Sequence, residues 1–164
     1  MEETLQAVKT MLSDANLRIV DQDLQRPWGG FLVLDESQIE AFAMTFFPSL
    51  VLPEPADHLP MSPKILLVAP HLRLSWQYHH RRAELWRVVT GSVGVFRSTT
   101  DEPGDLQTLN EAEEVNLVTG ERHRLVGLET WGVVAEIWQH TDATRPSNED
   151  DIVRLEDDYN RAGK

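Results

Sequence analysis

The sequence predicts a mostly β, single-domain protein built as a sandwich or a barrel. From Lys64 onward, short β-prone runs alternate with turn residues. The runs lie at 64–68, 73–79, 85–89, 92–97, 114–118 and 131–139, with turns at 90–91, 103–105 and 119–120. Closely spaced short strands are typical of sandwiches and barrels. A length of 164 residues suits one domain with one sizeable core, here expected at 64–140.

Two helices are expected before these strands. The first, at 4–12 within an N-terminal helical arm of residues 1–25, has one apolar face that carries Leu5, Val8, Met11 and Leu12. The second, at 37–47, has Ser37 as its N-cap, Glu40 three residues on, and Pro48 at its end. Five prolines at 48–63 predict an irregular arm rather than a strand.

Composition excludes several classes of protein and site. The net charge of −12 repels nucleic acid and anionic membranes, so neither is an expected partner. The chain has no cysteine, which excludes disulfides and thiolate ligands and fits a cytoplasmic location. Its acidic start and lack of a long apolar run predict neither a signal peptide nor a transmembrane span. The last segment, 147–164, is acidic.

Arginine dominates the basic residues, with twelve arginines against three lysines. Six arginines flank two short histidine-containing segments: Arg73, Arg81, Arg82, Arg87, Arg122 and Arg124. The planar guanidinium donates a fork of hydrogen bonds that matches phosphate or carboxylate. The chain is therefore expected to bind a small anion, unless these arginines only decorate exposed strand faces.

A candidate metal site lies in segment 74–86. Gln77 and His79 alternate on one strand and share a face, and a hairpin could return Glu84 against them. His123 follows the later turn at 119–121. An amide oxygen, two imidazoles and a carboxylate suit zinc, manganese, iron or nickel. The alternative is that these histidines are packed or exposed and that Glu84 pairs with Arg82 or Arg87.

The spacing of these residues resembles the first cupin motif. Gln77-x-His79, four residues, Glu84, six residues and Gly91 match its frame, with Gln77 in place of the usual first histidine. The Gln-x-His form, within Leu-Ser-x-Gln-x-His-His-x-Arg-Ala-Glu-x-Trp, resembles the type II phosphomannose isomerases. Three other segments resemble the same family: Arg-Pro-Trp-Gly at 26–29, Gly-Glu-Arg-His-Arg-Leu at 120–125, and Glu-Asp-Asp-Ile-Val-Arg at 149–154.

This resemblance covers most of residues 26–35 and 64–161. It implies a cupin barrel, a double-stranded β-helix or jelly roll, with a short N-terminal helix and one inserted helix. It also implies one divalent ion held by Gln77, His79, Glu84 and His123, with zinc the first choice and manganese, iron or nickel as alternatives. The implied reaction interconverts mannose 6-phosphate and fructose 6-phosphate, and fold analogy suggests a homodimer.

Several positions depart from the family pattern. Residues 36–63 are an insertion, and Trp76 replaces a usual leucine. Arg81 stands where the family usually has a third histidine. Residues 84–86 read Glu-Leu-Trp where the family has Glu-His-Trp, so Leu85 replaces a histidine. Residues 125–128 replace a turn of the Glu-Asn-Pro-Gly type. These changes keep the metal frame and leave the identity of the substrate open.

An isomerase also needs a base and an anchor for phosphate. Glu136 is the candidate base, with a metal-bound hydroxide as the alternative; otherwise Glu136 is an exposed carboxylate paired with an arginine. Arg73 and Ser75 alternate in phase with Gln77 and are expected to bind phosphate on the same face. Arg154 and Arg161, from the closing motif, are expected at the substrate as well, where Arg154 could also polarise the enediolate. The alternative for Arg154 is a salt bridge with its acidic neighbours.

The sequence leaves three functions open. The first is a metal-dependent sugar-phosphate isomerase, whose partner is a small sugar phosphate. The second is a non-catalytic module that binds a sugar or a nucleotide sugar, and the third is another metal-dependent cupin enzyme such as an oxygenase.

Overall fold

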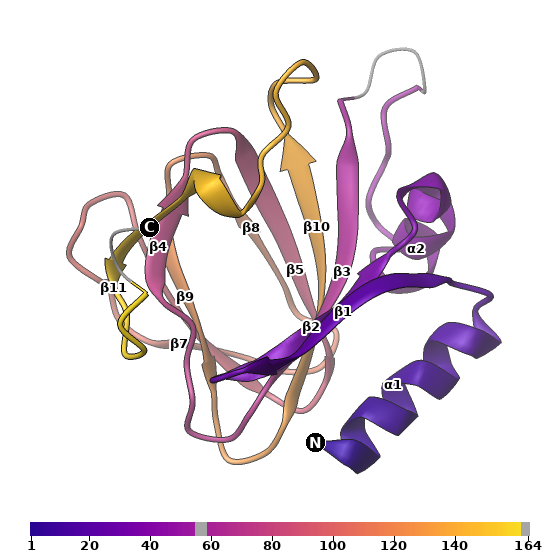
Figure 1. Cartoon of the computed structure of the whole chain (residues 1–164), viewed down its shortest axis with the longest axis horizontal. Coiled ribbons are helices and arrows are strands. Elements are labelled where there is room, and N and C mark those ends of the chain that lie inside the picture. Colours follow the sequence, from indigo (N-terminus) through magenta and orange to yellow (C-terminus); the bar gives the residue numbers. More distant parts are fainter. Residues whose placement is uncertain (55–58, 162–164) are drawn as a thin grey trace.

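The computed structural model describes residues 1–54 and 59–161, which form two antiparallel sheets that face each other as a barrel (Figure 1). The six-stranded sheet has the order β1 (Ile19–Arg26), β2 (Gly29–Leu34), β3 (Met61–Val68), β10 (Gly132–His140), β5 (Arg82–Thr90) and β8 (Glu114–Leu117). The five-stranded sheet has the order β11 (Ile152–Glu156), β4 (Trp76–His79), β9 (Arg122–Gly127), β6 (Val93–Ser98) and β7 (Gln107–Leu109).

The central strands of the six-stranded sheet, β3 and β10, are buried on both faces. Helices α1 (Glu2–Asp14) and α2 (Ile39–Phe46) lie outside the barrel beside β1, β2 and β3 (Figure 1). Their apolar residues form one core cluster with the outward side chains of β3 and β10, among them Leu67 and Ile137. A second cluster fills the barrel interior and includes Leu66, Trp86 and Val134. Because side chains alternate along a strand, Lys64 and Glu136 project to the interior with Leu66 and Val134.

The turn between β1 and β2 requires a glycine. Gly29 has a φ of +141°, which favours glycine, and a Cβ there would lie 2.0 Å from the carbonyl oxygen of Leu67. This hairpin places Arg26 at the end of β1 and Trp28 against the barrel interior. The Arg-Pro-Trp-Gly segment therefore builds one wall of the barrel mouth.

The predicted fold class is confirmed, and each predicted strand has a counterpart in the structure. Strands β1, β2, β7, β9 and β11 were not among the predicted runs. The arm at 1–25 is helical only at α1, because residues 19–26 form β1. Ser37 as an N-cap is wrong: Asp35 accepts the hydrogen bond from the Ser37 N–H, at the start of a 3-10 turn (Glu36–Gln38) that precedes α2.

The proline-rich arm was expected to lack strand up to residue 63, but β3 begins at Met61. Pro63 lies opposite Ile137 of β10, whereas pairing with β2 ends at Lys64. One edge of the strand is thus free at Pro63, which is where a proline is tolerated. Parts of the expected insertion, 55–58, and of the acidic segment, 162–164, fall outside the described residues. No described helix has both the length and the apolar character that crossing a membrane demands.

Candidate metal centre

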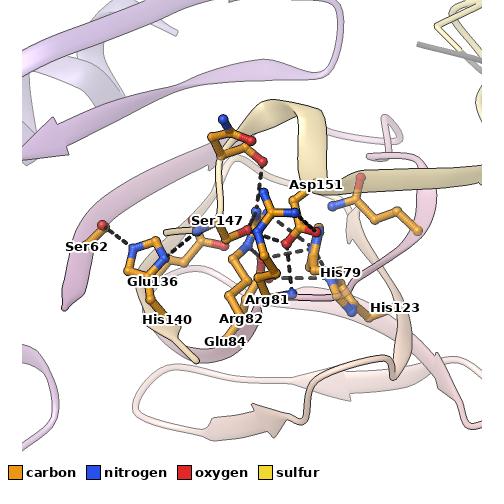
Figure 2. Close-up of polar contacts among 12 residues, drawn as sticks. Ser62, His79, Arg81, Arg82, Glu84, His123, Glu136, His140, Ser147 and Asp151 are labelled. Carbon is orange, nitrogen blue, oxygen red and sulfur yellow. Dashed lines mark hydrogen bonds and ion pairs between the residues drawn. The ribbon is translucent and has the colours of Figure 1, made fainter. Parts of the chain in front are cut away.

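His79, Glu84 and His123 come together in the barrel from three strands of both sheets. His79 ends β4, Glu84 lies on β5 and His123 on β9. The Nε2 of His79 lies 3.1 Å from Oε1 of Glu84, and the Nε2 of His123 lies 3.3 Å from Oε2 of the same carboxylate. The two Nε2 atoms are 3.2 Å apart, and all three side chains are buried (Figure 2).

This donor set fits a divalent metal ion. One ligand atom from each residue lies within 4.8 Å of the other two. The Nδ1 of His123 is 2.9 Å from the carbonyl oxygen of Glu121 and is thereby set as the donor, so Nε2 presents its lone pair to the cluster. Two imidazoles and a carboxylate are ligands for zinc, manganese, iron or nickel.

The protonation states also suit a metal ion. Burial lowers the pKa of His79 to about 4, so its imidazole is neutral at pH 7. Burial alone would raise the pKa of Glu84, but its interactions with His79, Arg82 and His123 outweigh burial and hold this pKa well below its ordinary value. A neutral imidazole and an ionised carboxylate are the forms in which these groups ligate metals.

Gln77 lies beside this cluster, directly opposite His123 in the pairing of β4 with β9. Ser75 Oγ donates a hydrogen bond of 2.5 Å to Gln77 Oε1. Both residues line a cavity in the barrel mouth, here called the metal cavity, whose walls also include Glu84, Lys64, Arg82, Glu136, Arg154 and Arg161. His79 and His123 are not in its walls; the Glu84 carboxylate joins them to it.

Glu136 is buried in the wall of the metal cavity rather than exposed. It accepts a hydrogen bond of 2.9 Å from the indole Nε1 of Trp86. Burial raises the pKa of Glu136 to about 8, with a further contribution from the charge of Glu84. A carboxyl group with a pKa near neutrality can both take up and release a proton at physiological pH.

Arg154 and Arg161 lie in the same cavity. Arg154 has an ion pair only at 3.9 Å, with Glu149, and its buried Nε has no hydrogen-bond partner in the described structure. The salt bridge expected with Asp150, Asp151, Asp157 or Asp158 does not form among the described residues, and the long contact with Glu149 takes its place. The Arg161 guanidinium is held by Asp157 through two hydrogen bonds, of 3.1 Å from Nε and 2.7 Å from Nη2.

Arg73 is not on the cavity face, contrary to the sequence prediction. It is partly exposed and donates hydrogen bonds of 2.7 and 3.0 Å to the carboxylate of Asp158. The prediction assumed that side chains alternate between the two faces of a strand from residue 73 onward. Strand β4 begins only at Trp76, and the adjacent residues Leu74 and Ser75 both line the cavity, so alternation does not hold before the strand.

Three basic residues of the cavity wall were not proposed from the sequence: Arg26, Lys64 and Arg82. Lys64 is buried, and its side chain makes no hydrogen bond or ion pair within the described ranges; its ammonium lies 3.2 Å from the centre of the Trp138 ring. The sequence did contain a signal for Lys64: it alternates with Leu66 and Val68, and so shares their face, on a strand that is otherwise apolar. Arg82 does pair with Glu84, at 2.8 Å, whereas Arg87 pairs with Glu114.

The positions that depart from the family pattern lie away from the cavity wall. Leu85 packs in the outer core cluster with the helices. Arg81 forms an ion pair of 3.3 Å with Asp151. Neither residue lines the metal cavity.

Comparison with known sequences identifies a family for most of this chain. The family model described as mannose-6-phosphate isomerase C-terminal matches residues 60–157. The alginate biosynthesis protein AlgA of Pseudomonas aeruginosa is 37% identical over 101 residues, which are 62% of this chain and 19% of that protein. A mannose-1-phosphate guanylyltransferase of Salmonella montevideo is 27% identical over 153 residues, 93% of this chain and 26% of that protein. The chain thus spans about a fifth to a quarter of the length of these relatives.

Solved structures confirm the cupin fold. A variant of the Bacillus subtilis oxalate decarboxylase superposes with a TM-score of 0.58, covering 82% of this chain and 30% of that one. The sequence identity is 12%, so the likeness extends to the fold alone.

Proposed function

Because this chain belongs to the mannose-6-phosphate isomerase C-terminal family, we propose that it is a metal-dependent sugar-phosphate isomerase, acting on an aldose and ketose pair such as mannose 6-phosphate and fructose 6-phosphate. One observation supports this most strongly. A buried carboxyl group with a pKa of about 8, Glu136, lines the same cavity as Gln77 and Glu84 of the candidate metal site.

The ligand set of the proposal is Gln77, His79, Glu84 and His123, with zinc first and manganese, iron or nickel as alternatives. When bound there, the ion would supply an electrophile for the oxygens of the two reacting carbons. Ser75 would position Gln77, since its hydroxyl already donates to the amide oxygen.

Glu136 is the proposed acid–base group. It would take a proton from the carbon that bears the hydroxyl and return it to the adjacent carbonyl carbon, while the hydroxyl proton passes to the former carbonyl oxygen. The indole of Trp86 fixes one carboxyl oxygen, so the second oxygen is the one available to the substrate. Lys64, which lies directly opposite on β3, would bind a substrate oxygen beside it.

Arg154 is the proposed anchor for the phosphate or the developing negative charge, with Arg161 next to it. Burial and the positive charge of Arg161 lower the pKa of Arg154, and its Nε lacks a hydrogen-bond acceptor in the described residues. A guanidinium in this state gains most from an anionic ligand. Arg26, whose charge also acts on Arg154, would contribute to the same positive field.

The decisive experiment incubates metal-loaded protein with mannose 6-phosphate in deuterated water. Formation of fructose 6-phosphate with deuterium at C2 of recovered mannose 6-phosphate would support the proposal. Absence of turnover with a panel of hexose and heptose phosphates would contradict it.

A second candidate is a non-catalytic module that binds a sugar or a nucleotide sugar. The relatives named guanylyltransferases favour it, because this chain matches only a part of each. The same deuterium experiment separates the two functions: a module would bind ligands in a thermal-shift panel without any exchange at C2. A homodimer in the cytoplasm completes the proposal, and sedimentation equilibrium tests the dimer.

A further inference from the structure

The buried guanidinium of Arg82 contacts two of the candidate metal ligands. Its Nε donates a 2.8 Å hydrogen bond to Oε1 of Glu84, and its Nη2 lies 3.2 Å from Nε2 of His79. The plane of the guanidinium lies over the Trp138 ring, with its central carbon 3.5 Å from the ring centroid. Arg82 is 2% exposed, so this arrangement has little freedom to change.

The opposite side of the same guanidinium binds the C-terminal segment, here residues 147–156. Arg82 Nη1 donates a 2.8 Å hydrogen bond to Ser147 Oγ and a weaker one, of 3.4 Å, to the carbonyl oxygen of Asn148. Ser147 Oγ in turn donates a 2.6 Å hydrogen bond to Asp151, as Figure 2 shows. One side chain therefore joins the metal ligands to this segment.

The C-terminal segment is also attached to the barrel beside Arg82. The backbone N–H of Ser147 donates a 2.9 Å hydrogen bond to His140, and Asp151 pairs with Arg81 at 3.3 Å and accepts hydrogen bonds from the backbone N–H groups of His80 and Arg81. Among the described strands, β11 pairs with β4. The same segment carries Glu149, Ile152 and Arg154 into the wall of the metal cavity. Its docking thus determines where the proposed anion-binding group lies.

We propose that Arg82 is a positioning residue that couples metal binding to docking of the C-terminal segment. A metal ion that fixes Glu84 and His79 fixes the guanidinium that contacts them, and the guanidinium fixes Ser147. Thermodynamic coupling is reciprocal, so a docked segment must also strengthen metal binding. The inference requires the candidate metal site but not isomerase activity, so a lack of turnover would leave it standing.

Hydrogen–deuterium exchange on the full chain tests the first half of the coupling. The chain is freed of metal with a chelator and compared with and without added Zn²⁺. Exchange at the β11 amides is expected to slow when zinc binds, while exchange in β7, an edge strand of the same sheet, stays unchanged. Equal exchange in β11 in both states, or no binding of any divalent ion by the wild-type chain, would overturn the inference.

Zinc affinity tests the second half. Ser147→Ala touches no metal ligand, and we expect it to weaken zinc binding about threefold to tenfold, in the range of coupling along such networks. Ser92→Ala is the control, since the Ser92 hydroxyl bonds only to Asn110 among the described residues. In an Arg82→Lys background, Ser147→Ala should cost no further affinity. Wild-type zinc affinity in Ser147→Ala, or an equal loss in Ser92→Ala, would refute the coupling even if Arg82→Lys fails to fold.

Discussion

Glu136 and Lys64 lie directly opposite each other on β10 and β3, and both side chains line the metal cavity. They form no ion pair with each other within the described residues, although the charge of Lys64 acts to lower the pKa of Glu136. Burial raises the pKa of Glu136 and lowers that of Lys64. The pKa values of both groups are thereby closer to 7 than in water, which is typical of groups that transfer or share protons.

Glu136→Gln is expected to abolish isomerisation while the fold is kept. The amide preserves the shape and can still accept the hydrogen bond from Trp86, but it cannot take up a proton. Loss of the acid–base group should reduce kcat by about 10²- to 10⁴-fold. Zinc affinity serves as the control, because Glu136 is not a ligand; a kcat equal to wild type would exclude Glu136 as the base.

Glu136 also predicts how stability depends on pH in the metal-free chain. Its pKa is raised in the folded state, from 4.5 to about 8, so the folded state holds a proton that the unfolded state has released in this range. The contribution is fully present below 4.5 and is lost as pH rises through about 8. Urea unfolding with a chelator present should show this decline in the wild type, and a smaller one in Glu136→Gln. Parallel curves for the two proteins would argue against the raised pKa.

His123→Ala should weaken zinc binding by more than about tenfold, since even changes to residues behind a ligand have effects of that size. Isothermal titration measures it. His71→Ala is the control, because His71 is exposed and its nearest acidic group is Glu129 at 3.7 Å. Equal zinc affinity in both variants would remove His123 from the ligand set.

Arg154→Met should weaken binding of inorganic phosphate to the metal-free chain about tenfold, in line with the loss of one charge-assisted hydrogen bond. Arg73→Met removes the same charge from a residue that is paired with Asp158 outside the cavity, and it should leave phosphate binding unchanged. If Arg73→Met weakened phosphate binding and Arg154→Met did not, phosphate would be assigned to Arg73, as the sequence predicts.

Phe42→Ala tests whether the inserted helix belongs to the core. Phe42 is fully buried in the outer core cluster, and the truncation should lower the free energy of unfolding by about 3–5 kcal/mol. Met44→Ala, on the same helix at 79% exposure, should have little effect. Similar urea midpoints for the two variants would mean that the helix contributes little to stability.

The sequence predicts the residues that come together, His79, Glu84 and His123, from their types and spacing and from alternation along one strand. The expected hairpin is wrong, because β4 and β5 lie in different sheets and Glu84 meets His79 across the barrel. Arg73 shows the limit of the same rule, since alternation was extended across residues that are not yet in the strand. Lys64 was missed, and Arg82 was considered only among the arginines near the histidines and as a partner of Glu84. Their other contacts, to Trp138 and Ser147, come from segments distant in sequence, which no local pattern specifies.

The helical arm shows a second limit. The apolar face of α1 was predicted from its periodicity, with Val8 and Leu12 buried as expected. Strand β1 was not predicted, because its exposed outer face mixes acidic and amide residues that lack a clear apolar alternation. Only its pairing with β2 defines it as a strand.

The β1–β2 hairpin is part of the barrel although it lies outside the stretch that matches the family model. The match to the family model begins at residue 60, yet β2 pairs with β3 along five positions and the hairpin supplies Arg26, Trp28 and Phe31 to the cavity wall. A fragment trimmed to the region of similarity would leave one side of β3 with unpaired backbone groups, a template for edge-to-edge aggregation. The stretch that matches the family model is therefore shorter than the barrel it belongs to, and truncation for expression should keep the β1–β2 hairpin.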